Sequence, residues 1–148
     1  MDKIILLIED DPDDRVLTLK ALLKDLQNGT VIVRYGVEAL DFLLGTGDYS
    51  GRHLSVRPHL ILLGRTLSHA SGLELLRGIK GDTGTNTIPV VVLTSSNKEQ
   101  DILDTYNLGA NSIIRKHVDY LKFCEDVKRT IAYWFNLNQV PQCHNIGD

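Results

Sequence analysis

Four short apolar segments of this chain end in residues that bear on possible chemistry. Glu9 and Asp10 follow the first segment, Gly64 ends the second, Thr94 follows the third and Lys116 follows the fourth. An acidic pair, a hydroxyl and a lysine suit a phosphoryl group with a divalent cation, because carboxylates hold the metal while hydroxyl and ammonium contact phosphate oxygens. Gly64 has no side chain, so this set of residues lacks a nucleophile.

Five carboxylates fall within six residues after the first apolar segment. Asp11 or Asp13 can cap the helix that follows, and Pro12 suits its first turn. Glu9 and Asp10 precede the cap, where crowded like charges normally need a cation or a basic partner. We therefore expect this pair to bind a divalent cation, with simple solvated acidity as the alternative.

Apolar runs and helical spacing place these residues at the ends of strands. Continuous apolar runs are typical of strands covered on both faces, and steps of three and four residues between apolar side chains are typical of helices. Strands are predicted over residues 3–8, 30–35, 60–63, 90–93 and 111–115. Helices are predicted over residues 13–26, 37–44, 72–80, 98–108 and 120–135. The polar segment 45–58 is expected to be a loop.

The alternation of strands with helices predicts a parallel sheet with right-handed crossovers and helices on both faces. In such sheets ligands bind beyond the carboxyl ends of the strands, where the acidic pair, the hydroxyl and the lysine would gather. With 148 residues, 43% of them hydrophobic, the chain fits one compact domain. We expect this domain over residues 1–136 and a polar tail over residues 137–148.

Helix starts and inward faces follow from capping residues and apolar spacing. Ser71 and Glu74 are expected to form a capping box, Asn97 and Asp119 to cap the two later helices, and Gly109 to end one of them. The expected inward positions are Val16, Leu19, Leu23 and Leu26 in the first helix, Leu73, Leu76 and Ile79 in the third, and Phe123, Val127, Ile131 and Trp134 in the last.

Charge and run length argue against several classes of function. The net charge is −3 and Lys and Arg form no block, so binding to nucleic acid or to an anionic membrane is not expected. No apolar run is long enough to span a membrane, and no signal-peptide pattern is present. We expect a cytoplasmic protein in which Cys124 and Cys143 are reduced thiols.

Six sequence motifs give the chain a resemblance to a known family. They are LLIEDDPDD, PHLILL, SGLELLRGIK, IPVVVLTSS, YNLGANS and AYWF. In this order and spacing they resemble the receiver domains of two-component response regulators over residues 3–135, and more narrowly the single-domain regulators associated with bacterial phytochrome kinases. The resemblance implies a flavodoxin-like, three-layer α/β fold with a five-stranded parallel sheet in the order 2-1-3-4-5 and five helices.

The resemblance also implies roles for the residues at the strand ends. In that family an Asp at the end of the third strand accepts a phosphoryl group from a histidine kinase, and this Asp holds Mg²⁺ together with two acidic residues after the first strand. By motif position the acidic pair is Glu9 and Asp10, and the residues that contact the phosphoryl oxygens are Thr94 and Lys116. The acceptor position is Gly64.

Three further positions depart from the family pattern, in a register that a glycine fixes. Gly72 stands eight residues after Gly64, as the family's glycine stands after its Asp, and this spacing fixes the register. Ser68 replaces a common Pro, Ile113 replaces the aromatic switch residue, and His117 replaces the Pro after the lysine. The peptide bond before His117 is expected to be trans, because a cis bond before a non-proline residue is unfavourable.

The missing carboxylate implies that Mg²⁺ binding is weak or lost. Glu9, Asp10 and the backbone carbonyl of Thr66 could still hold a partly hydrated ion. The alternative is a salt link in which Lys116 neutralises Glu9 and Asp10 directly.

We therefore expect a pseudo-receiver, a non-enzymatic module that acts through contacts with a sensor histidine kinase or another signalling protein. A homodimer is expected through the fourth helix, fifth strand and fifth helix, with Tyr133, Trp134 and Phe135 in the interface. The same rings could instead cover the edge of the core. Two further alternatives are a receiver phosphorylated at a displaced acceptor and a small Mg²⁺-dependent phosphatase that uses Asp11 or Asp13 as its nucleophile.

Overall fold

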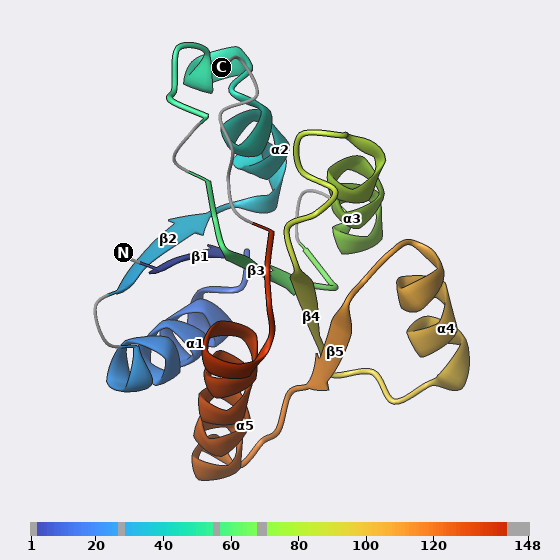
Figure 1. Cartoon of the computed structure of the whole chain (residues 1–148). Helices are drawn as coiled ribbons and strands as arrows, with labels where there is room; N and C mark the ends of the chain where they lie inside the picture. Colours follow the sequence, from blue (N-terminus) through green and yellow to red (C-terminus); the bar gives the residue numbers. More distant parts are fainter. Residues whose placement is uncertain (1–2, 27–28, 55–56, 68–70, 142–148) are drawn as a thin grey trace.

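The computed structural model describes residues 3–26, 29–54, 57–67 and 71–141 (Figure 1). Within these residues the strands are β1 (Lys3–Ile8), β2 (Gly29–Arg34), β3 (Leu60–Gly64), β4 (Val90–Thr94) and β5 (Ser112–Arg115). The α-helices are α1 (Pro12–Asp25), α2 (Gly36–Leu44), α3 (Gly72–Gly81), α4 (Glu99–Asn107) and α5 (Tyr120–Ala132). A 3₁₀ turn, η1 (Gly47–Tyr49), follows α2, and a π-helical turn, η2 (Tyr133–Leu137), extends α5.

The strands form one parallel sheet in the order β2-β1-β3-β4-β5, which confirms the predicted fold. Its register aligns the carboxyl ends of the strands, because Ile8 pairs with Leu63 and Gly64 pairs with Leu93. Thr94 in turn pairs with Arg115. The residues after these strand ends therefore share one rim of the sheet.

Two hydrophobic cores lie on opposite faces of the sheet, because successive side chains of a strand point to opposite faces. Ile5 and Leu7 of β1 pack in the core beneath α1 and α5, while Leu6 and Ile8 pack in the core beneath α2 and α3. Figure 1 shows the same three layers, with α1 and α5 below the sheet and α2 and α3 above it. Both faces of the central strands are covered, as their continuous apolar sequences require.

The inward face of α1 differs from the prediction. Val16 and Leu23 are 50% and 58% exposed, whereas Thr18, Ala21 and Leu22 are buried. The helix carries more apolar residues than one stripe needs, and its packing against α5 selects the stripe that contains small side chains. In α5 the prediction was right, since Phe123, Val127 and Ile131 are buried.

Helix capping also differs in part from the prediction. Asp119 caps α5 and accepts a hydrogen bond from the backbone N–H of Leu121. Gly109 ends α4 with a positive φ of 105°. Ser71 stands at the start of α3 but makes no side-chain cap hydrogen bond, and Lys98 rather than Asn97 occupies the N-cap position of α4.

The last helical segment bears on the predicted domain boundary. The π-helical turn runs from Tyr133 to Leu137, one residue beyond the end expected for the domain. Residues 142–148, with Cys143, lie outside the described residues, so the division at residue 136 stays a prediction. Cys124 is a free, buried cysteine.

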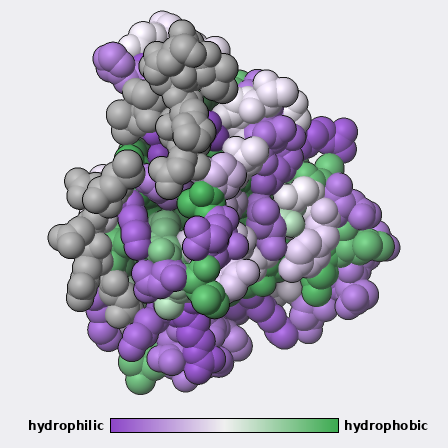
Figure 2. Space-filling model, in the orientation of Figure 1, coloured by the Kyte–Doolittle hydropathy of each residue, from purple (hydrophilic) through white to green (hydrophobic). Residues whose placement is uncertain are grey.

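The surface mixes polar and apolar side chains. Figure 2 shows hydrophobic residues among hydrophilic ones on one face, including the area over α4 at the right. Leu103 and Tyr106 of α4 are 51% and 48% exposed. None of the helices in the described ranges is both long and apolar enough to cross a membrane.

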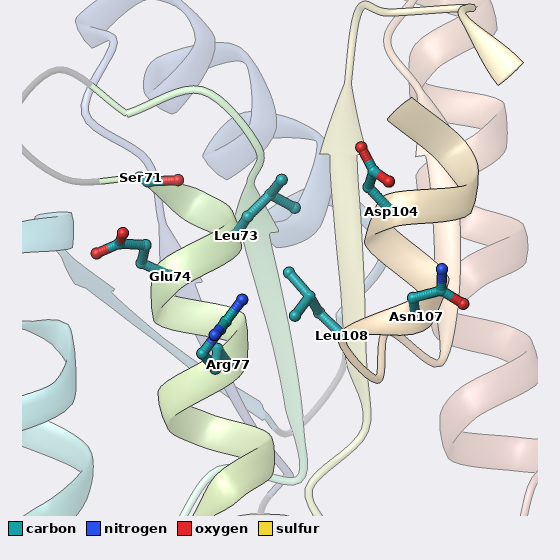
Figure 3. A pocket seen from close by; sticks show the side chains of 7 residues that line it. All are labelled: Ser71, Leu73, Glu74, Arg77, Asp104, Asn107 and Leu108. Atoms are coloured by element: carbon teal, nitrogen blue, oxygen red, sulfur yellow. The ribbon is translucent and has the colours of Figure 1, made fainter. Parts of the chain in front are cut away.

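A groove of about 410 Å³ separates α3 from α4. Leu73 of α3 and Leu108, which follows α4, point into it, and Arg77 and Asp104 line its sides (Figure 3). Leu73 was expected in the core, but it is half-buried in this groove while Leu75 takes the buried position. The groove is lined by both acidic and basic side chains.

Candidate functional site

The acidic pair after β1 is buried at the carboxyl rim of the sheet. Glu9 is 1% exposed and Asp10 is 7% exposed. Asp10 Oδ1 accepts a 2.8 Å hydrogen bond from the backbone N–H of Gly36, at the start of α2. Glu9 points the other way, toward the end of β5. The two carboxylates therefore serve different neighbours, and the solvated-acidity alternative is wrong for both of them.

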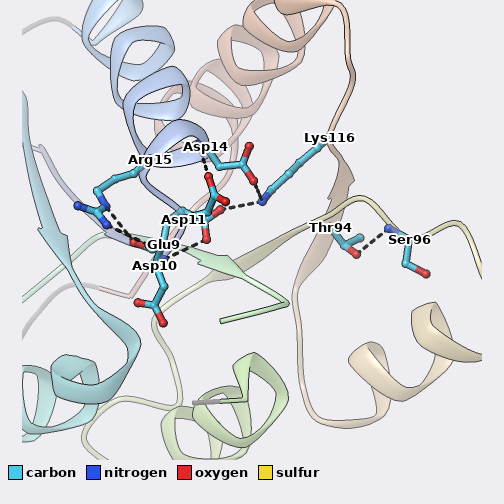
Figure 4. Close-up of polar contacts among 8 residues, drawn as sticks. All are labelled: Glu9, Asp10, Asp11, Asp14, Arg15, Thr94, Ser96 and Lys116. Atoms are coloured by element: carbon cyan, nitrogen blue, oxygen red, sulfur yellow. Dashed lines mark hydrogen bonds and ion pairs between the residues drawn. The ribbon is translucent and has the colours of Figure 1, made fainter. Parts of the chain in front are cut away.

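Lys116 neutralises the buried carboxylate of Glu9. Its Nζ lies 2.7 Å from Glu9 Oε1 and 2.9 Å from Asp14 Oδ2, as Figure 4 shows. We call Glu9, Asp14 and Lys116 the rim triad. A salt link of Lys116 with Glu9 and Asp10 was the alternative left open by the sequence. The link to Glu9 is present, but the second carboxylate is Asp14, and Asp10 faces α2 instead.

Two residues of α1 complete this rim and were missed by sequence reasoning. Asp14 reaches Lys116 from the first turn of the helix. Arg15 donates from Nε to the carbonyl oxygen of Glu9 and from Nη2 to that of Asp10, each at 3.1 Å. Both follow the capping residue Asp11 by three and four positions. That helical spacing could have indicated that they turn back toward the end of β1.

Two groups of the rim triad, Glu9 and Lys116, have raised pKa values. Burial raises the pKa of the Glu9 carboxyl above its ordinary 4.5, and the hydrogen bond and charge of Lys116 do not cancel this effect. For Lys116, burial acts to lower the pKa, but the hydrogen bonds and charges of Glu9 and Asp14 outweigh it, and the pKa is raised above 10.5. The two carboxylates around the ammonium thus favour the protonated state of Lys116, whereas the raised pKa of Glu9 comes from its burial.

Gly64 lies directly beside the Glu9 carboxylate. A Cβ atom added to Gly64 would stand 2.6 Å from Glu9 Oε2 and 3.2 Å from Glu9 Cδ. The side chain of Glu9 thus uses space that any larger residue at position 64 would need. Because the clash involves the far end of a flexible side chain, a residue with a side chain could be accommodated only if Glu9 moved.

Gly72 lies against the backbone at the end of β3. A Cβ atom on Gly72 would collide with the backbone carbonyl oxygens of Gly64 and Arg65. A short antiparallel bridge between Thr66 and Ser71 holds the same approach. Only glycine lets α3 begin this close to the end of β3. The spacing of eight residues between the two glycines therefore has a steric reason.

The hydroxyl at the end of β4 belongs to a separate polar group. Thr94 is 7% exposed, and its Oγ1 accepts a hydrogen bond from the backbone N–H of Ser96 at 3.0 Å. Arg65, which follows Gly64, forms an ion pair with Asp101 of α4 at 3.1 Å. Figure 4 shows the Thr94–Ser96 contact apart from the rim triad. Thr94 and Lys116 meet through the backbone, where Lys116 N–H donates to Thr94 O at 2.8 Å.

The donors at the rim do not form a ready metal site. Across the described ranges, no three His, Cys, Asp or Glu side chains are grouped as metal ligands. Glu9 binds Lys116, Asp10 accepts from Gly36, and Gly64 supplies no carboxylate. Thr66, whose carbonyl was a candidate ligand, takes part in the bridge to Ser71. The residues present therefore do not fit a preorganised Mg²⁺ site.

Asp11 and Asp13 lie at the start of α1. Asp11 is the N-cap and accepts a 2.9 Å hydrogen bond from the backbone N–H of Asp14. Asp13 is exposed in the first helical turn. The structure thus gives Asp11 the capping role that the sequence allowed.

The remaining predicted positions lie away from the rim triad. Ile113 is half-buried against the core beneath α2 and α3. Trp134 and Phe135 pack against the opposite core, while Tyr133 is 47% exposed. No peptide bond in the described ranges is cis, as expected for the bond before His117. Ser68 lies outside the described residues.

Comparisons with known proteins agree with this architecture. The response regulator receiver domain family matches residues 5–128 of the chain. Response regulator Rcp1 of Synechocystis sp. is 34% identical over 140 residues, which covers 94% of this chain and 93% of Rcp1.

Two solved structures extend the comparison. The phosphorylated cyanobacterial phytochrome response regulator RcpA is similar with a TM-score of 0.87 at 34% identity, covering 95% of this chain and 99% of that chain. The Mn²⁺-bound form of Rcp1 is similar with a TM-score of 0.83 at 33% identity, covering 94% of this chain and 99% of that chain.

Proposed function

This chain belongs to the response regulator receiver domain family, and we propose that it works in two-component signalling as a pseudo-receiver. Such a module keeps the receiver fold but lacks the phosphoacceptor carboxylate and signals through protein contacts. One observation carries the proposal: at the acceptor position, Gly64 has no side chain, and the Glu9 carboxylate lies 2.6 Å from where its Cβ would stand.

Phosphoryl transfer to a receiver needs a carboxylate nucleophile and positive charge to stabilise the transferred group. The nucleophile is missing at position 64. Lys116, the residue matched to phosphoryl contact, is held instead by Glu9 and Asp14. The ammonium of Lys116 is therefore paired with two carboxylates without a phosphoryl group.

We extend the proposal to the cation. One similar structure is a Mn²⁺-bound form of Rcp1, so a divalent cation suits that receiver. In this chain a cation at Glu9 would compete with an ammonium 2.7 Å from Oε1 and would lack the third carboxylate. Mg²⁺ binding through Glu9, Asp10 and the Thr66 carbonyl should therefore be weak or lost.

Incubation with acetyl phosphate and Mg²⁺, followed by intact-mass spectrometry, tests the proposal. The native chain should gain no phosphoryl mass. Gly64→Asp should gain about 80 Da once Glu9 moves aside, because its carboxylate can displace acetate from phosphorus. Gly64→Asn is the matched control, since it makes the same steric demand without a nucleophile, and it should gain nothing. A gain by the native chain would favour a displaced acceptor and overturn the pseudo-receiver.

The cation is tested on the same variants by thermal unfolding with and without Mg²⁺. A ligand that binds only the folded state raises its stability according to its concentration relative to Kd. Gly64→Asp should therefore unfold at a higher temperature in Mg²⁺, while the native chain and Gly64→Asn should not change. An equal shift in the native chain would show that Glu9 and Asp10 suffice as ligands.

For the protein contacts we propose a sensor histidine kinase or another signalling protein, and a homodimer through the face of α4, β5 and α5. Leu103, Tyr106 and Tyr133 expose about half of their surface there. Trp134 and Phe135 pack on the core, so they would contribute less to this interface than Tyr133. Light scattering of the native chain beside Leu103→Ser measures the oligomeric state, and a monomer at every concentration would exclude the homodimer.

The least favoured candidate is a small Mg²⁺-dependent phosphatase with Asp11 or Asp13 as nucleophile. The cap hydrogen bond of Asp11 and the exposed position of Asp13 leave neither carboxylate aimed at Thr94 or Lys116. Turnover of a phosphate ester by the native chain, lost in Asp11→Asn and Asp13→Asn, would support it.

A further inference from the structure

His59 binds both backbone polar groups of Ile4, at the amino end of the sheet. Its backbone N–H donates to the carbonyl oxygen of Ile4 at 2.8 Å, as in the ladder between parallel strands. The backbone N–H of Ile4 donates in turn to Nδ1 of the His59 imidazole at 3.0 Å. A side-chain nitrogen thus stands where a strand would normally supply a carbonyl oxygen, and it closes the pairing of β1 with β3 at this end.

This hydrogen bond depends on the protonation state of the imidazole. A neutral imidazole has one nitrogen that donates and one that accepts, whereas both nitrogens donate once the ring is protonated. Because Nδ1 accepts from Ile4, the proton of the neutral ring is on Nε2. A second proton, on Nδ1, would set two donors against each other and leave the Ile4 N–H without its acceptor. The contact therefore requires the neutral state of His59.

The surroundings of the ring oppose its protonation. Burial, and after it the positive charge of Lys3, lowers the pKa of His59 below its ordinary 6.5, and the backbone of Ile4 offsets these effects only in part. The other basic groups nearby are the chain neighbour Arg57 and the residues Arg34, Arg52 and His53, which line a cavity together with Ile4. Within the described ranges no carboxylate forms an ion pair with the imidazole, so a proton on it has no acidic partner there.

Lys3 connects this contact to the end of α5. Its Nζ donates to the carbonyl oxygen of Phe135 at 3.3 Å and to Oδ1 of Asn136 at 3.4 Å, and it lies 5.0 Å from the centroid of the Phe135 ring. Both acceptors belong to η2, the turn that follows α5. They are neutral, so they hold the ammonium less firmly than a carboxylate would. The first residues of β1 are therefore tied to β3 through His59 and to η2 through Lys3.

We propose that His59 is a proton-sensitive latch, which fastens the amino end of β1 to β3 while the ring is neutral and releases it when the ring is protonated. In the released state the Ile4 N–H has lost its acceptor. The charge on the ring also repels Lys3 and loosens its contact with η2. The latch thus makes the last helical turn sensitive to acidity, at the end of the sheet opposite to the rim triad.

The direction of the pH effect follows from the two states of the latch. In the open state the ring is solvated and has its ordinary pKa of 6.5, whereas in the closed state it binds a proton less readily. The latch is therefore fully effective above pH 6.5, and opening becomes easier as the pH falls below that value. Between pH 7 and pH 5 the equilibrium constant for opening should rise about tenfold.

Amide hydrogen exchange of the full ¹⁵N-labelled chain tests the latch. After correction for the intrinsic pH dependence of exchange, the protection of the Ile4 N–H should fall about tenfold from pH 7 to pH 5, because exchange reports the open state. Equal protection of Ile4 at the two pH values would overturn the proposal.

Two variants assign the effect to one ring. In His59→Asn the side-chain Oδ1 replaces Nδ1 as an acceptor that does not titrate, so the protection of Ile4 should be the same at pH 7 and pH 5. His117→Asn is the matched control, since it removes an exposed histidine at the carboxyl end of the sheet and should leave the tenfold fall unchanged. A fall that persists in His59→Asn would overturn the latch.

Titration of the imidazole nitrogens needs no variant. In long-range ¹H–¹⁵N spectra of the native chain, Nδ1 of His59 should carry no proton at pH 7, and the ring should titrate below pH 6.5. The amide signal of Phe135 should shift with the same midpoint, because Lys3 links the ring to η2. A proton on Nδ1 at pH 7 would overturn the latch, and a Phe135 signal that ignores the titration would overturn its link to η2.

Discussion

Lys116 and Lys80 lie at opposite ends of the sheet and bind oxygen atoms of different charge. Lys116 follows β5 at the carboxyl rim and contacts the carboxylates of Glu9 and Asp14. Lys80, near the end of α3, donates at the amino end to three neutral oxygens, the carbonyls of Asn86 and Ile88 and Oδ1 of Asn111. One lysine thus neutralises carboxylate charge at the carboxyl end of the sheet, and the other joins loops at the amino end.

The surroundings shift the pKa values of the two lysines in opposite directions. Burial lowers the pKa of Lys80 below 10.5, because its neutral acceptors do not offset the loss of solvent. The pKa of Lys116 is raised, because two carboxylates outweigh its burial. The difference teaches that charge is concentrated at the carboxyl rim, where Glu9, Asp14 and Lys116 meet, and not around Lys80 at the amino end.

The largest expected effect comes from removing the charge of Lys116. Lys116→Met should lower the free energy of unfolding by about 3–5 kcal/mol at pH 7, because it leaves the buried Glu9 carboxylate without its counterion. Urea unfolding followed by circular dichroism measures the loss. The loss should be smaller at pH 5, since the uncompensated Glu9 binds a proton in the folded state and folding then gains stability as pH falls.

The double variant Lys116→Met, Glu9→Gln is the control for this prediction. It removes the buried charge together with its counterion, so it should be more stable than Lys116→Met alone. If Lys116→Met were no less stable than the native chain, the rim triad would have no part in holding β1, α1 and β5 together.

Replacing the lysine at the amino end should have a smaller effect. Lys80→Met should lower the free energy of unfolding by about 1–2 kcal/mol, because its neutral partners cost less to leave unpaired than a buried carboxylate. The same urea experiment measures it. A loss as large as that of Lys116→Met would remove the distinction between the two ends of the sheet.

The fold was predictable from the sequence because its signals are local and repeated. The apolar strands are short and continuous, and Gly109 and Asp119 mark helix ends by their own chemistry. The inward face of α1 was not predictable, because Val16 and Leu23 continue an apolar spacing as well as Leu22 does. Only packing against α5 decides between these stripes.

Two members of the rim triad, Glu9 and Lys116, could be expected at one rim from the sequence, but the third member, Asp14, and the pairing could not. Strand ends bring Glu9 and Lys116 to one rim, and their opposite charges made a contact the simplest alternative to a bound cation. The choice of Asp14 over Asp10 depends on how α1 is turned about its axis and on the N–H of Gly36 that Asp10 accepts. Neither is encoded in the spacing of residues along the chain. The position of the Glu9 carboxylate in the space beside Gly64 likewise depends on three-dimensional packing and not on residue spacing.

The smallest effect, and the most direct comparison, is the titration of the two lysines. In a nuclear magnetic resonance titration of the side-chain Cε signals, Lys116 should titrate above pH 10.5 and Lys80 below it. The unfolded chain in urea supplies the reference, and Lys116→Met and Lys80→Met each remove one signal and assign it.

Because the unfolded state binds more protons than the folded state at Lys80, stability from Lys80 should rise with pH below 10.5. At Lys116 the folded state binds more protons, so its contribution is present at neutral pH and is lost as pH rises above 10.5. Identical titration of both lysines would show that Glu9 and Asp14 do not hold the proton on Lys116, and the rim would then resemble the amino end of the sheet.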